Sequence, residues 1–205
     1  FWKDDFSVDS SSQYTGHVGS FTWDTANKRL IVPADTSQKK IYRSIQVNDG
    51  DYLEIRQLAL TEVQEVTVSC GSLVFAIDGN DVYSLRYSIS PTGEQIYRMT
   101  RNGGGISTNL NIGNLISPPI RVIRNGKNAI LMCSGVEEQP TITLPDTAIW
   151  VIGVRTSRYA TEVYSLTHGS SVSYADDFSS DTTERYQPVL GTVAYDDTNK
   201  RMNVT

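Results

Sequence analysis

The sequence lacks the charge clusters and the long apolar runs that mark nucleic-acid binding and membrane insertion. Its 205 residues carry 18 Lys and Arg against 23 Asp and Glu, and no basic run exceeds a pair such as Lys39–Lys40. A protein that binds a phosphate backbone needs a dense group of cations, so nucleic acid is a poor partner for this chain. No apolar run approaches the roughly 18 residues that cross a bilayer, so we expect no membrane insertion.

Cysteine and histidine are also scarce, with two residues of each type. Cys70 and Cys133 stand in apolar stretches, where a thiol packs as a small hydrophobic group. We therefore expect reduced, buried thiols, with one disulfide as the alternative. His17 and His168 belong to no His-Glu-x-x-His pattern and are expected at the surface. No Gly-x-Ser-x-Gly motif offers a serine nucleophile, so the sequence carries neither of these two hydrolytic sites.

What the chain does contain is a long internal repeat. The segment "DDFSVDSSSQYTGHVGSFTWDTANKRLIV" at residues 4–32 returns without a gap, 172 residues later, as "DDFSSDTTERYQPVLGTVAYDDTNKRMNV". Tyr14 matches Tyr186, and most non-identical positions keep their residue type. An ungapped repeat of this kind predicts tandem domains, with residues 1–172 as one domain and residues 173–205 as the beginning of a second copy.

The boundary between the copies is expected in the small polar segment "THGSSVS", residues 167–173. Because the chain starts without Met and "FWKDDF" is not a signal-peptide opening, we expect a fragment of a longer protein. One or two strands bury too little apolar surface to be stable alone. Residues 174–205 are therefore expected to dock on the preceding domain or to pair with another chain.

Between the repeats, short β-branched and aromatic segments alternate with turn signals such as Asp49–Gly50 and Asn125–Gly126. In "YSLRYSI", residues 83–89, apolar and polar residues alternate, which predicts a half-buried strand with Arg86 on its polar face. No segment has a convincing helical period. The pattern predicts an all-β fold in which two antiparallel sheets pack as a β-sandwich of the jelly-roll type.

Several of these segments, in this order, resemble the concanavalin A-like lectin and glucanase superfamily, including laminin-G-like modules. The resemblance covers nearly all of residues 4–172 and is carried by "DDFS", "GSFTWDTANKRLIV", "DGDYLEIRQ", "YSLRYSI", "RNGGGIST", "IRVIRNGKNAILMCSG" and "AIWVIGVRT…TEVYSL". It implies an opening strand that pairs near the closing one, a hairpin at "IRVIRNGKNAILMCSG" and a closing strand at "IWVIGVR". Because pattern rather than invariant motif carries the resemblance, it bears on fold more than on function.

Glycosidases of that superfamily place carboxylates on one strand in the pattern Glu-x-Asp-x-x-Glu, and the nearest match here is "DGDYLE", with Asp49, Asp51 and Glu54. On a regular strand Glu54 points away from the other two, whereas retaining hydrolysis needs two carboxyl groups about 5 Å apart. A turn that opens a strand explains the same letters. We therefore expect no catalytic residues and no enzyme activity, with a glycoside hydrolase using these three residues as the less favoured alternative.

No motif requires a cofactor, but one loop suggests a structural calcium ion. In "DGND", Asp78, Asn80 and Asp81 offer hard oxygen ligands on a tight turn, and calcium takes six to eight such ligands. An ordinary turn of polar residues is the competing interpretation. The repeated pair Asp4–Asp5 is a second calcium candidate, for which a solvated strand start is the alternative.

Sugar binding requires aromatic faces and planar polar groups, and the chain has 11 Tyr and 3 Trp. The candidate carbohydrate-binding residues are Arg86, on the polar face of its strand, and Tyr97 and Arg98 in "QIYRMT". Each tyrosine is also a candidate for the core.

These observations predict a non-catalytic carbohydrate-binding or adhesion module, repeated in tandem within a larger surface or viral or phage fibre protein. Its expected partners are a glycan or cell-surface polysaccharide and a neighbouring repeat or another copy of the chain. Its expected location is extracellular, at a cell surface or on a virion. Repetition favours this function because weak sugar sites gain avidity from it. The alternative is a structural spacer or a virion assembly or decoration domain without a ligand.

Overall fold

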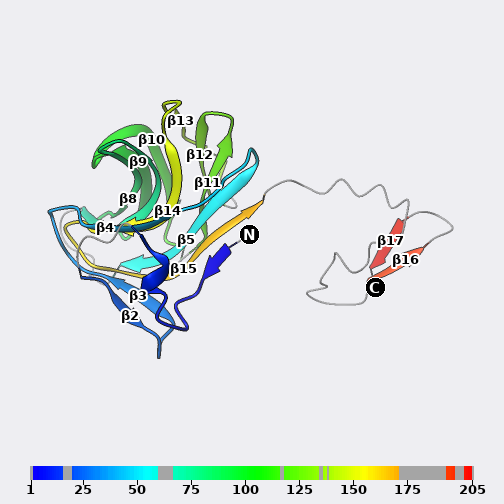
Figure 1. Ribbon diagram of the computed structural model, residues 1–205, viewed down its shortest axis with the longest axis horizontal. Coiled ribbons are helices and arrows are strands. Elements are labelled where there is room, and N and C mark those ends of the chain that lie inside the picture. The colour runs from blue at the N-terminus through cyan, green and yellow to red at the C-terminus, as the bar shows by residue number, and fades with distance from the viewer. Residues whose placement is uncertain are drawn as a thin grey trace. The chain divides into compact units, whose positions relative to one another are not determined.

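A computed structural model describes residues 2–15, 20–59, 67–115, 118–133, 136–137 and 139–170, and the backbone of residues 193–196 and 201–204. The chain divides into two compact units, Phe1–Ser171 and Val172–Thr205. The described residues of both units form strands (Figure 1). Within the described residues the helical structure is one 3-10 turn, Ser11–Gln13, and no helix is long and apolar enough to cross a membrane.

The first unit is built from strands joined by short connections. Their bounds are β1 Trp2–Asp4, β2 Thr22–Asp24, β3 Arg29–Val32, β4 Lys40–Ser44, β5 Asp51–Ala59, β6 Val68–Cys70, β7 Ser72–Asp78, β8 Asp81–Ile89, β9 Gln95–Arg101, β10 Gly104–Gly113, β11 Ile120–Asn125, β12 Asn128–Cys133, β13 Thr141–Thr143, β14 Ile149–Arg155 and β15 Thr161–Ser170. Turn residues separate them as the sequence predicts, with Gly50 and Gly126 in the left-handed region at φ 83° and 59°.

The strands form two antiparallel sheets. The eight-stranded sheet has the order β13-β12-β11-β5-β15-β3-β2, with β1 also paired to β15. The seven-stranded sheet has the order β10-β9-β8-β7-β14-β4, with β6 also paired to β8. The predicted all-β antiparallel sandwich is therefore confirmed. So are the pairing of the opening strand with the closing strand and the β11–β12 hairpin. The segment "IWVIGVR" is β14, however, and the unit closes with β15.

The core lies between the sheets and takes alternate residues from each strand. In β8, Tyr83, Leu85 and Tyr87 are buried and Arg86 is exposed, as predicted. Ser84 and Ser88, expected on the polar face, are buried as well, so the strand is more deeply buried than its sequence predicts. Tyr87 stacks on Tyr97 of β9 with ring centroids 4.8 Å apart. Each such buried apolar side chain contributes roughly 1.5–3 kcal/mol relative to exposure. Both cysteines are reduced and buried, as expected.

Two sequence-based placements near the closing strand are wrong. Thr167–Ser170, predicted as the start of a linker, belongs to β15 and pairs with Asp51–Glu54 of β5. His168, predicted at the surface, is 9% exposed, and its Nε2 lies 3.2 Å from Oδ2 of Asp51. Small and polar residues fit here because the β5 backbone and a carboxylate satisfy them. His17 and residues 171–173 lie outside the described residues.

The buried carboxylate of Asp4 stabilises the start of the repeated segment through hydrogen bonds. Asp4 accepts hydrogen bonds from the Tyr14 hydroxyl at 2.9 Å, from the backbone N–H of Phe6 at 2.9 Å and from the Ser10 hydroxyl. Trp23 Nε1 in turn donates to Ser10 Oγ at 3.0 Å. These donors engage both oxygens of Asp4, the first residue of the pair that the sequence offers as a second calcium site.

The described part of the second unit is one antiparallel hairpin, β16 Val193–Asp196 and β17 Arg201–Val204. Asp196 pairs with Arg201 in this hairpin, just as Asp24 pairs with Arg29 between β2 and β3. Each partner is displaced by 172 residues, so the two hairpins share one register. The rest of the segment expected to dock or to pair with another chain lies outside the described residues.

Candidate functional site

A pocket of about 350 Å³ opens where β6 and β7 both pair with β8. β7 pairs with β8 up to Ser84 and β6 pairs with it from Tyr87, so Leu85 and Arg86 line the pocket between the two pairings. The lining residues are Thr36, Gln38, Thr67, Ser69, Cys70, Leu85, Arg86, Thr100, Gly103, Arg155, Ser157 and Arg158. Volumes of this size are typical of small-molecule sites.

Gly71 permits the close packing that frames the pocket. An added Cβ at Gly71 would overlap the backbone carbonyl oxygen of Arg155 and lie 2.8 Å from Cγ1 of Val32. The carbonyl of Gly71 accepts a hydrogen bond from Gln57 Nε2 at 3.0 Å. The junction between β6 and β7 therefore lies directly against the end of β14, which brings Arg155 to the pocket.

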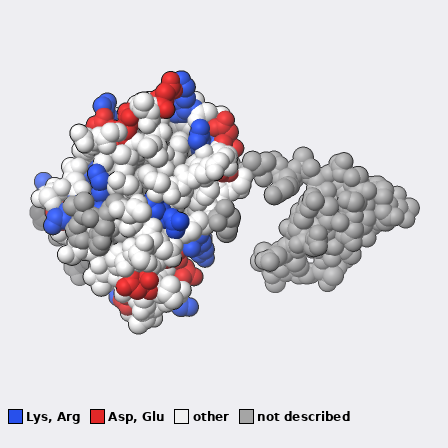
Figure 2. Space-filling model, viewed as in Figure 1, with Lys and Arg blue, Asp and Glu red and all other residues white. Residues whose placement is uncertain are grey.

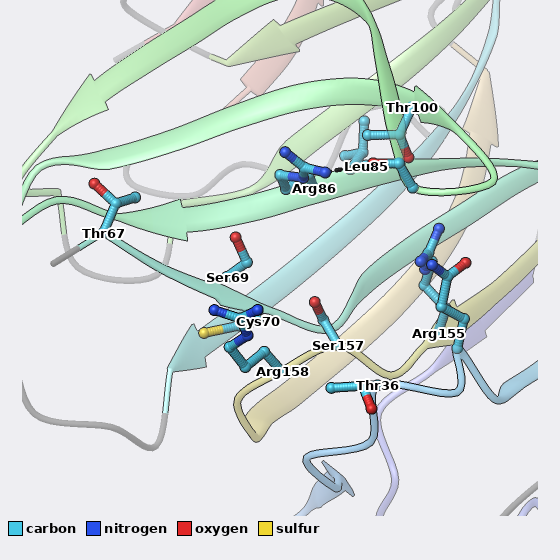
Figure 3. A pocket seen from close by; sticks show the side chains of 12 residues that line it. Thr36, Thr67, Ser69, Cys70, Leu85, Arg86, Thr100, Arg155, Ser157 and Arg158 are labelled. Atoms are coloured by element: carbon cyan, nitrogen blue, oxygen red, sulfur yellow. Dashed lines mark hydrogen bonds between the residues drawn. The ribbon is translucent and has the colours of Figure 1, made fainter.

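Three arginines from different parts of the chain line this pocket, as Figure 3 shows. Arg86 comes from β8, Arg155 ends β14, and Arg158 follows in the connection to β15. Arg155 is 7% exposed, and its Nη1 donates to Ser84 Oγ at 3.0 Å. Burial lowers the pKa of Arg155, and the positive charge of Arg86 lowers it further. The pocket is thus a site of concentrated positive charge.

The remaining lining side chains are mainly neutral hydrogen-bonding groups. The Thr100 hydroxyl forms a hydrogen bond of 3.0 Å with the Ser84 hydroxyl, which also accepts from Arg155. The Ser69 hydroxyl lies 3.3 Å from the Ser88 hydroxyl. Among the described residues that line the pocket, none is acidic and none is aromatic. The described lining can therefore bind a ligand through guanidinium, hydroxyl and amide groups.

An apolar patch occupies the same outward face of the seven-stranded sheet. Val74, Val82 and Val151 form a buried cluster separate from the main core, and Tyr42 packs against it. Tyr42 points outward because its neighbour Ile41 enters the core, and Val74 lies directly across from Ser84. A tyrosine on this face has the amphipathic character that sugar sites use. The alternation of "KIYRS" indicates its direction but not its neighbours.

The three candidate carbohydrate-binding residues separate in the structure. Arg86 lines the pocket described above. Arg98 lies in a different, more open hollow with Gly105 to Asn109 and Thr141, and its Nε donates to the carbonyl of Ser107 at 2.7 Å.

Tyr97 is wrongly assigned to a sugar site. Its side chain is fully buried against Tyr87, and burial raises the pKa of its hydroxyl, which has no hydrogen-bond partner among the described residues. In β9, Tyr97 and Met99 face the core, so Arg98 between them must face outward.

The proposed calcium loop is a turn whose carboxylates already have protein partners. Asp78 and Asp81 pair directly across the β7–β8 turn. Asp81 accepts from Arg101 Nε at 2.8 Å and from Asn102 Nδ2 at 2.6 Å, and Asp78 accepts from Thr147 Oγ1 at 2.7 Å. Arg101 lowers the pKa of Asp81. Asn80 is exposed beside them, and the described residues contain no group of three His, Cys, Asp or Glu able to hold a metal.

The three carboxylates considered for hydrolysis lie on or beside β5, in the other sheet. Asp51 shares the face of Leu53 and accepts from the backbone N–H of Asn48 at 2.8 Å. Glu54 points to the opposite face and pairs with Arg121 at 2.8 Å. Asp49 accepts from the backbone N–H of Gly126 at 2.9 Å. Asp51 and Glu54 are therefore on opposite faces, as the strand periodicity predicts.

The strand order and the antiparallel pairing form a jelly-roll sandwich, the fold of galectin-like and β-glucanase structures. Solved structures with this fold resemble the chain at very low sequence identity. A galectin-like fold protein of unknown function from Bacillus subtilis matches with a TM-score of 0.56 and 11% identity, over 82% of this chain and 94% of that one. The CBM2 module of the evolved Dit protein of Lactobacillus casei BL23 phage J-1 matches with a TM-score of 0.51 and 11% identity, over 84% of this chain and 96% of that one.

The β-glucanase of Bacillus licheniformis has the same fold, with a TM-score of 0.52 and 9% identity over 82% of this chain and 96% of that one. No protein-family model matches the chain, and no curated protein is significantly similar to it in sequence. At these identities the likeness establishes the fold alone.

Proposed function

We propose that the chain is a non-catalytic carbohydrate-binding module that holds a glycan on the outward face of the seven-stranded sheet. The observation that carries this proposal is the pocket of about 350 Å³, with its lining of guanidinium, hydroxyl and amide groups. Such groups match the donors and acceptors of sugar hydroxyls, and the half-buried Tyr42, which packs against the buried valine cluster, offers a ring face to a sugar. The fold shared with a phage carbohydrate-binding module and a galectin-like protein supports it.

The positions of the acidic residues favour binding over hydrolysis. Glycoside hydrolysis requires two carboxyl groups on either side of one sugar bond. The described lining of the pocket contains no Asp or Glu, and Asp51 and Glu54 are bonded elsewhere. Hydrolysis is the opposing candidate function, because a β-glucanase shares this fold.

We further propose that such modules are arranged in tandem within a surface or viral or phage fibre protein, outside the cell or on a virion, as an adhesion element. The repeat of residues 4–32 at 176–204 and the equal register of the hairpins β2–β3 and β16–β17 support this arrangement. Neighbouring copies would raise the avidity of weak individual sites.

A structural spacer or assembly domain without a ligand is the second candidate. It is favoured by the lack of an aromatic side chain among the described residues that line the pocket. Sugar sites commonly use such a ring.

A glycan array probed with residues 1–205 tests the proposal, together with a variant that fills the pocket. Thr36 is exposed at the pocket, so Thr36→Trp should abolish glycan binding without lowering the melting temperature. Thr143→Trp, on the exposed β13 of the other sheet, is the matched control and should bind normally. Absence of binding to every glycan would favour the structural spacer. Full binding by Thr36→Trp would show that the glycan binds outside this pocket and would overturn the assignment of the site. Release of reducing ends would favour the hydrolase.

A further inference from the structure

The pocket contains a buried cation that has no anionic partner among the described residues. Arg155 is 7% exposed, and its described hydrogen bond goes to a neutral hydroxyl, Ser84 Oγ. A guanidinium carries five N–H donors, and a buried charge is costly unless an opposite charge offsets it. The ion pairs among the described residues include no carboxylate bonded to Arg155, Arg86 or Arg158.

Four other arginines of the unit are paired with carboxylates, whereas Arg43, Arg56 and Arg98 have no ion pair among the described residues. Arg29, Arg101, Arg121 and Arg124 each form an ion pair with a nearby carboxylate. The chain as a whole carries a net charge of −5, so acidic groups are plentiful. On the face shown in Figure 2, acidic and basic side chains are interspersed rather than collected in one patch. The pocket differs because three arginines lie together there, one of them buried, without a carboxylate among the described lining residues.

The acidic residue nearest the pocket in sequence is already neutralised. Asp35 precedes Thr36 and accepts from the Ser37 hydroxyl at 2.5 Å and from Lys39 at 3.0 Å. The Ser37 hydrogen bonds, followed by Lys39, lower the pKa of Asp35 to about 2. Its charge is thus matched by Lys39 and not by the pocket arginines.

Several donors converge at the tip of the β9–β10 hairpin. Arg86 donates to the carbonyl of Gly103. A Cβ added to Gly103 would lie 2.9 Å from Gln38 Nε2 and 3.2 Å from Arg155 Nη2, so both nitrogens point toward this corner of the pocket. Converging N–H groups and guanidinium forks are the arrangement that recognises carboxylate, sulfate and phosphate oxygens.

We propose that this pocket binds the anionic group of an acidic glycan, a sugar that carries a carboxylate, sulfate or phosphate. The inference rests on the carbohydrate-binding function proposed above and specifies its ligand class. Arg155 and Arg86 hold the charged oxygens, Arg158 approaches them from the rim, and the neighbouring hydroxyls contact the sugar. The bound anion supplies the opposite charge that the described lining residues do not provide.

The first experiment tests the anion site without a sugar. Inorganic sulfate and inorganic phosphate are added separately to residues 1–205, and the melting temperature is followed at constant ionic strength against chloride. We expect a saturable rise with at least one anion, because a ligand that binds only the folded state stabilises it. Because Arg158 is exposed, the variant Arg158→Gln should fold normally but show no anion-dependent rise in melting temperature. Arg56→Gln, an exposed arginine on the other sheet, is the control with the same change of charge.

The second experiment compares charged and neutral forms of the same polymer by titration calorimetry. The pairs are polygalacturonate with its methyl ester, dextran sulfate with dextran, and a phosphorylated mannan with its dephosphorylated form. At least one charged form should bind about tenfold or more tightly than its neutral partner, the effect of one charge-assisted hydrogen bond. Arg158→Gln and Arg86→Gln should remove that preference, while Arg56→Gln keeps it.

The outcomes separate the two proposals. Equal binding of neutral and charged polymers, with no effect of the arginine variants, would overturn the acidic ligand and leave the carbohydrate-binding function standing. A melting-temperature rise with sulfate or phosphate but no binding to any polymer would leave an anion site and overturn the glycan in both proposals. Loss of the charge preference in Arg56→Gln as well would show an unspecific effect of net charge and also overturn the assignment.

Discussion

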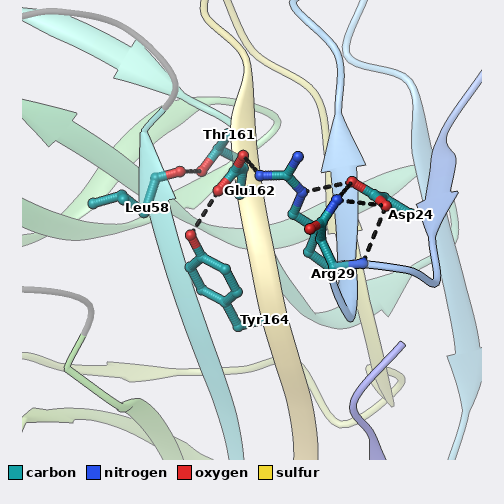
Figure 4. Close-up of polar contacts among 7 residues, drawn as sticks. Asp24, Arg29, Leu58, Thr161, Glu162 and Tyr164 are labelled. Carbon is teal, nitrogen blue, oxygen red and sulfur yellow. Dashed lines mark hydrogen bonds and ion pairs between the residues drawn. The ribbon is translucent and has the colours of Figure 1, made fainter. Parts of the chain in front are cut away.

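Arg29 on β3 joins Glu162 on β15 to Asp24 on β2, so one guanidinium connects three strands of the eight-stranded sheet (Figure 4). Its Nε lies 2.8 Å from Oδ2 of Asp24, and its Nη1 donates to Glu162, which also accepts from the Tyr164 hydroxyl at 2.6 Å. Glu162 is 6% exposed, so loss of Arg29 would leave a buried carboxylate without its cation.

We therefore expect Arg29→Ala to lower the melting temperature by several degrees, about 4 °C for each kcal/mol lost. Arg56→Ala, an exposed arginine without a described ion pair, serves as the control and should have little effect. A melting temperature for Arg29→Ala equal to that of the control would mean that the three strands are held without this network.

Gly153 is needed because β4 and β14 approach closely at this point. An added Cβ would overlap the carbonyl oxygen of Ile41 and lie 2.5 Å from the Cα of Tyr42, and both are backbone atoms that cannot rotate away. Gly153→Ala should lower the free energy of unfolding by about 1–3 kcal/mol or more, since overpacking forces the backbone to shift. Urea unfolding measures the change. Gly104→Ala, in exposed β10, is the control, and equal stability of the two variants would contradict the prediction.

Local periodicity was enough to predict the fold class but not the composition of the sheets. The alternation of residues 83–89 places Arg86 outward without any tertiary information. The same rule applied to β9 separates Tyr97 from Arg98, so Tyr97 could have been assigned to the core from the sequence. By contrast, Thr167–Ser170 looks like a linker because its residues are small and polar, and only pairing with β5 makes it a strand.

The candidate site was predictable only in part, because sheet pairing assembles it. Arg86 and Arg155 are far apart in sequence and meet because β14 pairs with β7, which pairs with β8. No local pattern in "VRTSR" distinguishes Arg155 and Arg158 from surface arginines. A useful signal would have been their lack of an acidic neighbour within the segment.

The thiol of Cys70 should be inert in the folded chain. It is 2% exposed, and burial raises its pKa to about 12, far above the value of about 8.5 for an ordinary cysteine. Because the thiolate is the reactive form, a chromogenic disulfide reagent near pH 8 should label Cys70 only after unfolding. Rapid labelling of the native chain, lost in Cys70→Ala, would contradict the burial.

The raised pKa of Cys70 should also make the folded chain less stable at alkaline pH. The folded-state pKa of Cys70 is raised, so this contribution is present below the unfolded value of about 8.5 and is lost as the pH rises toward about 12. The free energy of unfolding should therefore fall over this range, and Cys70→Ala should reduce the slope below about pH 10, where tyrosines begin to ionise. An unchanged slope in the variant would assign the loss to other groups.

Asp4 and Tyr14, which both recur in the repeat as Asp176 and Tyr186, should be energetically coupled. Asp4→Ala leaves the buried Tyr14 hydroxyl and the Phe6 N–H without their acceptor, which should cost about 1–3 kcal/mol for each group. Tyr14→Phe should cost less because it removes one bond and keeps the ring. A double-mutant cycle measured by urea unfolding should show a coupling clearly different from zero, whereas simple additivity would argue against the network.

Calcium should have little effect on the stability of residues 1–205. The carboxylate oxygens of Asp81 accept from Arg101 and Asn102, and those of Asp4 accept from Ser10, Tyr14 and Phe6. A calcium ion at either place would have to displace these donors and would face the positive charge of Arg101 at the β7–β8 turn. We therefore expect equal melting temperatures in excess calcium and in a chelator. A saturable calcium-dependent rise that disappears in Asp81→Asn would restore the metal interpretation of this turn.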